Sequence, residues 1–485
     1  MKRATFFCWM AISLFYFTKS RAQIVLPKIL GNGMVLQRNQ PVPIWGTAAK
    51  GEKVTINFKN QTKTVVANAE GKWMVTLSPM PASAEPATLT IAGINTIKLN
   101  NILVGEVWLC SGQSNMQYEM RKNSKVKKPD TSTVNSPVDE LQRAHNPQIR
   151  IFLVTQKNLQ KPDATHSGWS VAEDSALRAF SAAGYFFGKN LNDDLKVPVG
   201  IISSAVSGSH IEPWAPQEAY DAIPYFKANN IQISNDPGKF YAKMIEPLSP
   251  FAIKGFLWYQ GETSCFLAET ISYTYKMEAL INNWRKLWGN KNMPFYYVQI
   301  APFYYSKSKG EVPFTEFTEP ELREAQTLAL QIPHTGMIVT TDLNDDLKNI
   351  HPPFKWEVGH RLELQALANT YGQKNVVFSG PMYKSMKVSG NKIILQFNYQ
   401  GSGLVSHDGK PLTDFTIAGQ DGKFVPAEAT IKGNTVVVSA SSVSNPMASR
   451  FAWSESAQPN FYNKNGLPAV PFRTDNPLKF TLTSN

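Results

Sequence analysis

Four short segments of the sequence each place a possible nucleophile, base or hydrogen-bond donor after an apolar run, either close to its end or at the end of the loop that follows it. The first holds Gly112 and Ser114, in the run Gly-Gln-Ser-Asn-Met. A serine that opens a helix has free backbone N–H groups and the positive end of the helix dipole beside it, which together stabilise an oxyanion. Serine is also a common helix N-cap, and Met116 stands where the GxSxG elbow has its second glycine. By itself, this segment only suggests a nucleophile at Ser114.

Two further segments could supply oxyanion donors and a carboxylate. Gly208 follows the apolar run 199–205, and a glycine at a strand end lets its backbone N–H approach a reacting carbonyl closely. Gln260 and Glu262 follow the run 252–259. Gln260 could donate its amide to an oxyanion, and Glu262 could orient a histidine or cap the next helix.

The fourth segment offers a general base. His351 follows an acidic loop that contains Asp345 and Asp346, and two prolines come directly after it. Prolines restrict the loop and hold the imidazole at an edge of the fold. A general base needs a pKa near the working pH and a fixed pose, and histidine supplies both. A serine nucleophile requires such a base together with oxyanion donors, so the four segments complete one another.

The elements that must position these residues alternate between strand and helix after residue 103. Parallel strands covered by helices on both faces produce this pattern, and their carboxyl ends collect reacting groups. We expect strands at 106–110, 149–154, 199–205, 252–259, 295–300 and 336–341, and helices at 179–191, 270–288, 319–331 and 355–370. The first three candidate segments directly follow strands in this set, and the loop with His351 follows the last one.

Short alternating strands separated by turn residues flank this α/β region on both sides. We expect them at 42–45, 53–58, 62–67, 72–77, 87–91 and 96–99, and again at 392–397, 415–418, 429–431 and 435–438. The expected division is a cleaved leader at 1–22, an N-terminal β-sandwich domain at 23–102, an α/β domain at 103–372 and a C-terminal β domain at 373–485.

Together the segments resemble the SGNH (GDSL-like) hydrolases, and within them the sialate O-acetylesterase family. The resemblance is carried by residues 112–116 (Gly-Gln-Ser-Asn-Met), 258–262 (Trp-Tyr-Gln-Gly-Glu) and 350–355 (Ile-His-Pro-Pro-Phe-Lys), with further similarity at 36–46 and 450–468. It implies a flavodoxin-like three-layer α/β/α catalytic domain, which is the α/β domain at 103–372. It also implies an esterase that removes O-acetyl groups from sialic acids and needs no metal or cofactor.

The resemblance implies specific roles for the candidate residues. Ser114 is the expected nucleophile and His351 the base. The oxyanion hole is expected from the Ser114 backbone N–H, Gly208 and Gln260, with Gln113 and Asn115 as further oxyanion or substrate-binding positions. These enzymes usually carry an aspartate two or three residues before the histidine, where this sequence has Asn349 and Lys348. The expected partner of His351 is therefore Glu262, with Asp345, Asp346 or a backbone carbonyl as alternatives.

Composition narrows the class of protein. Residues 1–22 have Lys2 and Arg3 before an apolar run and small residues at the exit, which is typical of a cleaved export signal, so we expect a periplasmic or secreted protein with no membrane association. Removing this leader, with its four basic and no acidic residues, lowers the formal net charge from +12 to +8. No nucleic-acid recognition motif accompanies that charge, and the cluster at 121–128 is interpreted as a solvated loop. Cys110 and Cys265 fit no zinc-binding spacing and are expected to be buried free thiols.

The expected partner is an acetylated carbohydrate, and the sequence carries no signal for an oligomeric state. One alternative is an esterase for acetylated xylan or another plant glycan, which would use the same residues. A second is a carbohydrate-binding protein on an inactive hydrolase scaffold. A glycosidase that uses Glu262 and a loop aspartate would leave Ser114 and His351 without a purpose.

Overall fold

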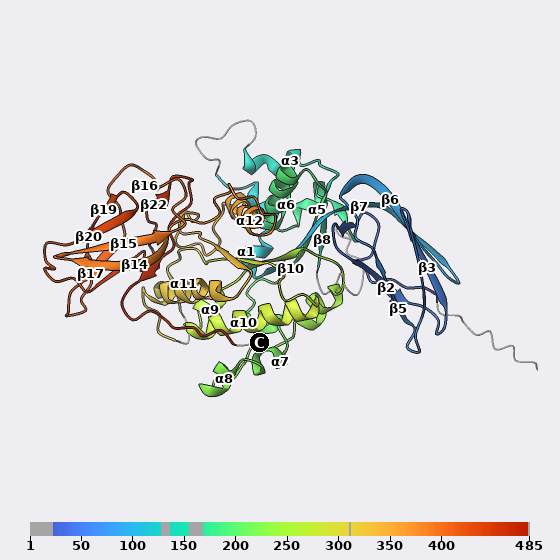
Figure 1. The fold of residues 1–485 in the computed structure, drawn as a ribbon, viewed down its shortest axis with the longest axis horizontal. Helices are drawn as coiled ribbons and strands as arrows, with labels where there is room; N and C mark the ends of the chain where they lie inside the picture. Colours follow the sequence, from blue (N-terminus) through green and yellow to red (C-terminus); the bar gives the residue numbers. More distant parts are fainter. Residues whose placement is uncertain (1–22, 128–135, 155–167, 310–311, 484–485) are drawn as a thin grey trace, which may run out of the picture.

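The computed structural model describes residues 23–127, 136–154, 168–309 and 312–483 (Figure 1). The expected leader at 1–22 lies outside the described residues. Within these ranges, no helix is long and apolar enough to cross a membrane. Both described cysteines, Cys110 and Cys265, are buried and free, as expected.

A parallel sheet forms the centre of the molecule, in the strand order β13-β12-β11-β7-β10-β8 with β9 at one edge. β9 pairs antiparallel with β8, and the other neighbours along this path pair in parallel. The strands are β7 (Thr96–Gly112), β8 (Ile149–Leu153), β9 (Ser170–Val171), β10 (Val199–Ala205), β11 (Gly255–Tyr259), β12 (Phe295–Val298) and β13 (Thr335–Ile338).

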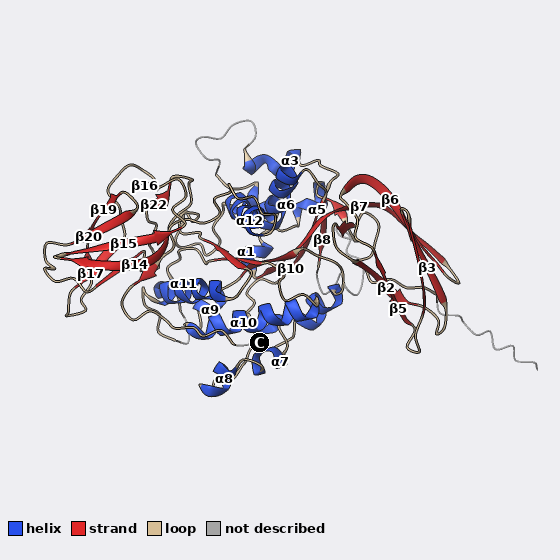
Figure 2. Cartoon of the chain, viewed as in Figure 1, coloured by secondary structure: helices blue, strands red, loops and turns tan. Residues whose placement is uncertain are grey.

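Helices cover both faces of this sheet (Figures 1 and 2). Helices α6 (Ala182–Leu195) and α12 (Lys355–Asn369) lie on one face, and α10 (Ile271–Leu287) and α11 (Thr318–Leu328) lie on the other. The side chains of β11 alternate between these layers, as the two-residue period of a strand requires. Trp258 packs edge-on against Trp284 of α10 at 5.8 Å, whereas Leu257 belongs to the buried cluster that includes Leu362 of α12. The expected α/β/α fold class is confirmed.

Among the described residues, six N-terminal strands precede β7; this long strand joins four of them to the central sheet, and the second and fifth pair only with each other. The six strands are β1 (Val35–Gln37), β2 (Val42–Thr47), β3 (Lys53–Phe58), β4 (Gln61–Val66), β5 (Lys72–Leu77) and β6 (Ser83–Ala92). β7 pairs antiparallel with β6 in its first part and parallel with β10 and β11 in its last. We expected two strands, at 96–99 and 106–110. Asn100 and Asn101 suggest a turn, but Asn101 takes up a positive φ of 60° within a strand that continues.

The C-terminal region holds two four-stranded antiparallel sheets with a separate apolar core. One contains β14 (Met382–Ser389), β15 (Lys392–Asn398), β20 (Thr435–Ser439) and β19 (Glu428–Lys432). The other contains β18 (Val425–Pro426), β17 (Phe415–Ala418), β21 (Ala448–Phe451) and β23 (Phe472–Arg473), and β16 (Leu404–Ser406) pairs with β22 (Phe461–Asn463). After β23 the chain returns to the α/β region, where the Thr483 N–H donates to Glu278 of α10 at 2.8 Å.

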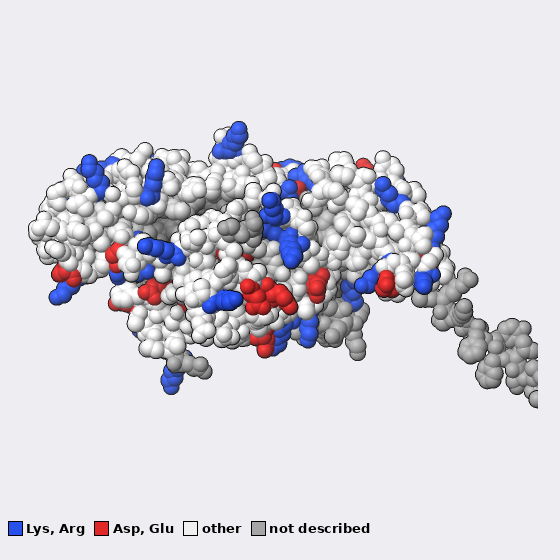
Figure 3. Space-filling view, turned by 60° about the horizontal axis from the view of Figure 1, so that its bottom comes forward, with Lys and Arg blue, Asp and Glu red and all other residues white. Residues whose placement is uncertain are grey.

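Short helices lie in the connections between the strands of the central sheet. They are α1 (Ser114–Gln117), α2 (Met120–Asn123), α3 (Glu140–Arg143), α5 (Asp174–Arg178), α7 (Gln217–Asp221), α8 (Pro224–Ala228) and α9 (Glu262–Cys265). On the face shown in Figure 3, basic side chains are scattered and interspersed with acidic ones.

Candidate active site

Ser114 sits at a tight junction between β7 and α1. Gly112 ends the strand with a φ of 132°, and a Cβ at this position would lie 2.1 Å from the carbonyl oxygen of Tyr259. The Gln113 N–H donates to that same oxygen at 2.9 Å. The turn therefore passes directly against the end of β11, and glycine is the residue that fits there. Ser114 is partly exposed, whereas Asn115 after it is fully buried.

His351 lies in the loop between β13 and α12 and is also partly exposed. Its backbone N–H donates to Asn349 Oδ1 at 3.0 Å. Burial, together with the nearby charges of Lys355 and Lys122, lowers the pKa of His351 to about 4. The imidazole is therefore neutral at neutral pH and able to accept a proton. Among the described residues, no hydrogen bond is formed by the His351 ring or by the Ser114 hydroxyl.

Asn115 joins the nucleophile segment to the base segment and to Glu262. Its Nδ2 donates to Glu262 Oε1 and, at 3.0 Å, to the carbonyl oxygen of Ile350. Its Oδ1 accepts from Lys355 Nζ at 2.7 Å, and Lys355 Nζ also donates to the Pro352 carbonyl at 2.8 Å. The Asn115–Ile350 bond thus joins the residue after Ser114 to the residue before His351.

This buried cluster contains an acidic side chain, Glu262, and a basic one, Lys355, and each acts on the pKa of the other. Burial raises the pKa of Glu262, while the hydrogen bond from Asn115 and the charge of Lys355 act in the opposite direction. Burial also lowers the pKa of Lys355 to about 7, with Lys122 adding to the effect and Glu262 opposing it. The Lys355 ammonium lies 5.0 Å from the ring centre of Tyr118 and 5.1 Å from that of Tyr259, and such contacts stabilise a cation away from water.

Gly208 is an exposed residue of the β10–η2 loop, where η2 is the short helix Glu212–Trp214. It has a φ of 69° and open space around its Cα. The preceding residue, Ser207, donates through its backbone N–H and its hydroxyl to Gln117 Oε1, at 2.7 and 2.8 Å. This pair of bonds attaches the Gly208 loop to α1, the helix that begins with Ser114.

The three amide side chains expected to face the oxyanion or substrate are instead bonded inside the protein. Gln260 is fully buried; its Nε2 donates to Ser209 O and Ser264 Oγ, both at 3.4 Å, and its Oε1 accepts from the Tyr273 hydroxyl at 2.9 Å. Gln113 Oε1 accepts from the Thr263 hydroxyl at 3.0 Å. Together with Asn115, these amides tie neighbouring strand ends to each other.

No carboxylate is hydrogen-bonded to the His351 ring within the described ranges. Glu262, which we expected to orient His351, is bonded to Asn115 and interacts with Lys355. Asp345 and Asp346 are exposed, and Asp346 accepts from the backbone N–H of Lys348 at 3.0 Å. The structure thus brings Ser114, Gly208, Glu262 and the His351 loop to one edge of the sheet without pairing an acid with the base.

Two residues of the site were not predicted from the sequence, Lys355 and Gln117. The sequence contained an indication of Lys355, because the helix dipole disfavours a cation in the first turn of a helix. A lysine at such a position suggests a specific interaction that offsets this cost. That interaction is its buried contact with Asn115 and Glu262. Gln117 carried no signal, since its partner Ser207 is 90 residues away in the sequence.

Comparisons with known proteins place the chain in a family of carbohydrate esterases. Residues 104–368 match the model of a family described as carbohydrate esterase, sialic acid-specific acetylesterase. Human sialate O-acetylesterase is 29% identical over 494 residues, which cover 91% of each chain. The mouse enzyme is 28% identical over 520 residues, covering 91% of this chain and 93% of its own. A crystal structure of a carbohydrate acetylesterase from Xanthomonas citri is 36% identical, covers 93% of this chain and 100% of its own, and has a TM-score of 0.81.

The matched family model covers more than half of the chain and contains all four segments of the candidate site. This chain therefore belongs to the carbohydrate esterase family of sialic acid-specific acetylesterases.

Proposed function

We propose that this protein removes O-acetyl groups from sialic acids by serine catalysis, with Ser114 as the nucleophile and His351 as the base. The observation that carries this proposal is the hydrogen bond from Asn115 Nδ2 to the Ile350 carbonyl. It holds the residue after the proposed nucleophile against the residue before the proposed base.

In the first step, Ser114 Oγ attacks the acetyl carbonyl carbon while His351 accepts the serine proton. The negative charge that develops on the carbonyl oxygen is stabilised by the backbone N–H groups of Ser114 and Gly208. The exposure of Gly208 and the bonds from Ser207 to Gln117 support this role. Gln260 contributes a further donor only when its amide leaves its two long hydrogen bonds.

The C–O bond to the sugar then breaks, and protonated His351 donates its proton to the departing sugar oxygen. In the second step the oxygen of a water molecule attacks the acetyl-enzyme while His351 accepts one of the water protons. The acyl bond to Ser114 then breaks, His351 returns the proton to Ser114 Oγ, and acetate is released. No residue is changed at the end of the cycle.

For Glu262 we propose an indirect role. Its carboxylate holds the Asn115 amide, which in turn holds Ile350 next to His351. Glu262→Gln should therefore reduce turnover more than Asp345→Asn or Asp346→Asn, because the two aspartates are exposed. A smaller loss in Glu262→Gln than in either aspartate variant contradicts this assignment.

The catalytic assignment is tested with p-nitrophenyl acetate and purified variants. Ser114→Ala and His351→Ala should each lower kcat on the order of 10⁴-fold or more, as removals of triad members do. Ser78→Ala, at an exposed serine of the N-terminal region, is the matched control and should keep full activity. Near-normal turnover by Ser114→Ala would refute the proposal.

The substrate is tested by acetate release from 9-O-acetylated sialic acid and from acetylated xylan, at equal ester concentration. We expect the higher kcat/KM on the sialic acid ester, since the matched family model is described as sialic acid-specific. A higher kcat/KM on xylan assigns the same residues to a plant-glycan esterase.

We also propose that the protein is exported to the periplasm or beyond, from the charge and apolar pattern of residues 1–22. N-terminal sequencing of the mature protein should begin at Gln23, after the small residue Ala22. An intact N-terminus on active protein in the cytoplasm contradicts export.

A further inference from the structure

A cavity lies at the edge of the central sheet opposite to Ser114, where the strands begin. Its volume is about 480 Å³, in the range of small-molecule sites. Lys254, Pro294 and His334 line it, and each directly precedes or adjoins the start of one of the strands β11, β12 and β13. The candidate active site is at the carboxyl ends of the strands, and five residues of β11 separate the two edges by roughly 17 Å.

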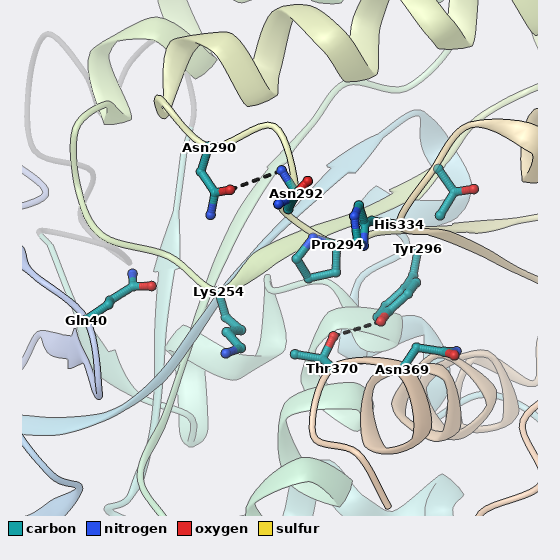
Figure 4. A pocket seen from close by; sticks show the side chains of 10 residues that line it. Gln40, Lys254, Asn290, Asn292, Pro294, Tyr296, His334, Asn369 and Thr370 are labelled. Carbon is teal, nitrogen blue, oxygen red and sulfur yellow. Dashed lines mark hydrogen bonds between the residues drawn. The ribbon is translucent and has the colours of Figure 1, made fainter. Parts of the chain in front are cut away.

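The lining of this cavity is polar and rich in uncharged hydrogen-bonding groups (Figure 4). Several of these groups keep free donors or acceptors within the described part of the chain. Asn290 accepts from the Asn292 backbone N–H at 3.0 Å through its oxygen only, and the Asn292 amide has no protein partner. Gln40 donates to Ile253 O at 3.2 Å, which leaves its oxygen free. Planar amides that both donate and accept match the paired hydroxyl groups of a sugar ring.

The charge of the cavity is positive. The Lys254 side chain extends between Gln40 and Thr370 (Figure 4), and its ammonium lies 5.7 Å from the ring centre of Tyr371. None of the residues that line the cavity is acidic, and Lys254 has no ion pair among the described residues. An ammonium held over an aromatic face without a carboxylate is available to an anion.

Arg285 adds a second positive charge behind the cavity wall. This residue of α10 is buried, and it donates to the Met293 carbonyl at 2.9 Å and the His334 carbonyl at 3.0 Å. Burial lowers the pKa of Arg285 to about 10, so the guanidinium remains charged at neutral pH. These two bonds also fix the loops that carry Asn292 and His334, so the wall is held in one shape before a ligand arrives.

We propose that this cavity is a second, non-catalytic binding site for a carboxylate-bearing sugar. Lys254 would pair with the carboxylate, while Asn290, Asn292 and Gln40 would bind ring hydroxyl groups. The proposal does not depend on which residues perform the hydrolysis. An acidic glycan bound in this cavity would lie at the amino ends of the central strands, whereas the candidate active site lies at their carboxyl ends.

The test counts binding sites by isothermal titration calorimetry in the full chain carrying Ser114→Ala, so that no ester chemistry interferes. The probes are N-acetylneuraminic acid and its methyl ester, which is the same sugar without the negative charge. We expect the acid to bind at one more site in the Ser114→Ala chain than in the double variant that also carries Lys254→Gln. In the double variant, the affinity of the cavity for the acid should fall at least about tenfold, so that binding there is no longer counted. Asn292→Asp, which places a carboxylate in the cavity, should weaken the acid in the same way.

Lys387→Gln, at an exposed lysine of β14, is the matched control and should leave the number of sites unchanged. In the otherwise native chain, Lys254→Gln should hydrolyse p-nitrophenyl acetate at the native rate. Equal site numbers with and without Lys254 overturn the proposal, as does equal binding of the methyl ester at the second site. Displacement of the acid by an equal concentration of acetate or phosphate would show a simple anion site and also overturns it. Loss of hydrolysis in Ser114→Ala tests the catalytic proposal separately.

Discussion

His351 and Lys355 are two bases whose pKa values lie well below their usual ranges, because they share a partly dehydrated and positive environment. Burial is the largest cause for both, the charge of Lys355 adds to the shift of the His351 pKa, and the exposed Lys122 acts on both. At neutral pH the imidazole is neutral and the lysine is near its midpoint. A neutral imidazole can accept a proton, as the proposed mechanism requires of His351, and its low pKa would make the protonated form a strong acid toward the departing sugar oxygen.

The pH profile should report this environment. Because the base must be neutral to act and its pKa is about 4, kcat/KM should stay high as the pH falls through 6.5 and decline only near pH 4. The same lowered pKa means that the unfolded chain binds the proton more readily, so stability from His351 is present above pH 6.5 and is lost between pH 6.5 and 4. A kcat/KM profile with its acid limb near pH 6.5 contradicts the depressed pKa.

Removing the lysine charge should move that limb. Lys355→Met deletes the cation that lowers the His351 pKa, so the acid limb of kcat/KM should shift to higher pH. Lys122→Gln should shift it in the same direction by less, since Lys122 is the smaller cause. The lysine also holds Asn115, so kcat should fall at every pH in Lys355→Met. A limb that stays in place while kcat falls would mean that Lys355 acts through position alone.

At the scale of elements, the site depends on how closely the β7–α1 turn approaches the end of β11. The Tyr259 carbonyl accepts from the Gln113 N–H at 2.9 Å, and the glycine before it has no room for a side chain. A shift of α1 away from β11 would break this bond and carry Ser114 away from the loop that holds His351. The turn therefore joins β7 to α1 and also fixes the position of Ser114, the proposed nucleophile.

Gly112→Ala should consequently damage both stability and activity. The added Cβ would meet backbone at 2.1 Å, and we expect a loss of about 3 kcal/mol or more in the free energy of unfolding, at the upper end for overpacking plus backbone strain. Gly289→Ala is the control, because its φ of 67° is strained but nothing lies within 4 Å of the Cβ. It should cost only about 1 kcal/mol. Urea denaturation measures both, and equal losses would show that the contact with Tyr259 is relieved at no cost.

In the molecule as a whole, the C-terminal β region is hydrogen-bonded to the loop that carries the proposed base. Glu455 accepts from the Ser306 N–H at 2.8 Å, and Gln458 donates to the Asn344 carbonyl. Asn344 in turn donates to the Asn349 carbonyl at 3.0 Å, two residues before His351. The chain end then packs on α10, with the rings of Phe480 and Tyr275 4.9 Å apart. Two successive hydrogen bonds thus connect the C-terminal region to the loop that carries the proposed base.

Gln458→Ala should therefore lower kcat about three- to tenfold while thermal stability changes little, since a small displacement of a catalytic group has a large effect on rate. Gln396→Ala, at an exposed position of β15 in the same region, should leave kcat unchanged. Steady-state kinetics and thermal unfolding on both variants check this. A large drop in Tm with unchanged kcat would show that the contact serves folding alone.

Much of the fold could be predicted from the sequence because its signals are local. Strands such as β3 and β5 alternate buried with more exposed residues between turn residues, and β10 is buried along its whole length, as expected of a strand covered on both faces. β7 was misjudged for a local reason as well. Asn100 and Asn101 resemble a turn, whereas pairing with strands on both sides keeps the chain extended.

The sequence by itself determined the family resemblance and the candidates Ser114, His351 and Gly208, because the chemistry of serine, histidine and a strand-end glycine can be inferred from type and position. The hydrogen-bond partners of Asn115, Glu262, Gln260 and Lys355 became known from the tertiary structure alone. Asn115 meets Glu262 147 positions away, Ile350 235 away and Lys355 240 away. Whether an amide faces substrate or joins two strand ends depends on which distant groups are buried beside it, and no local pattern contains that information.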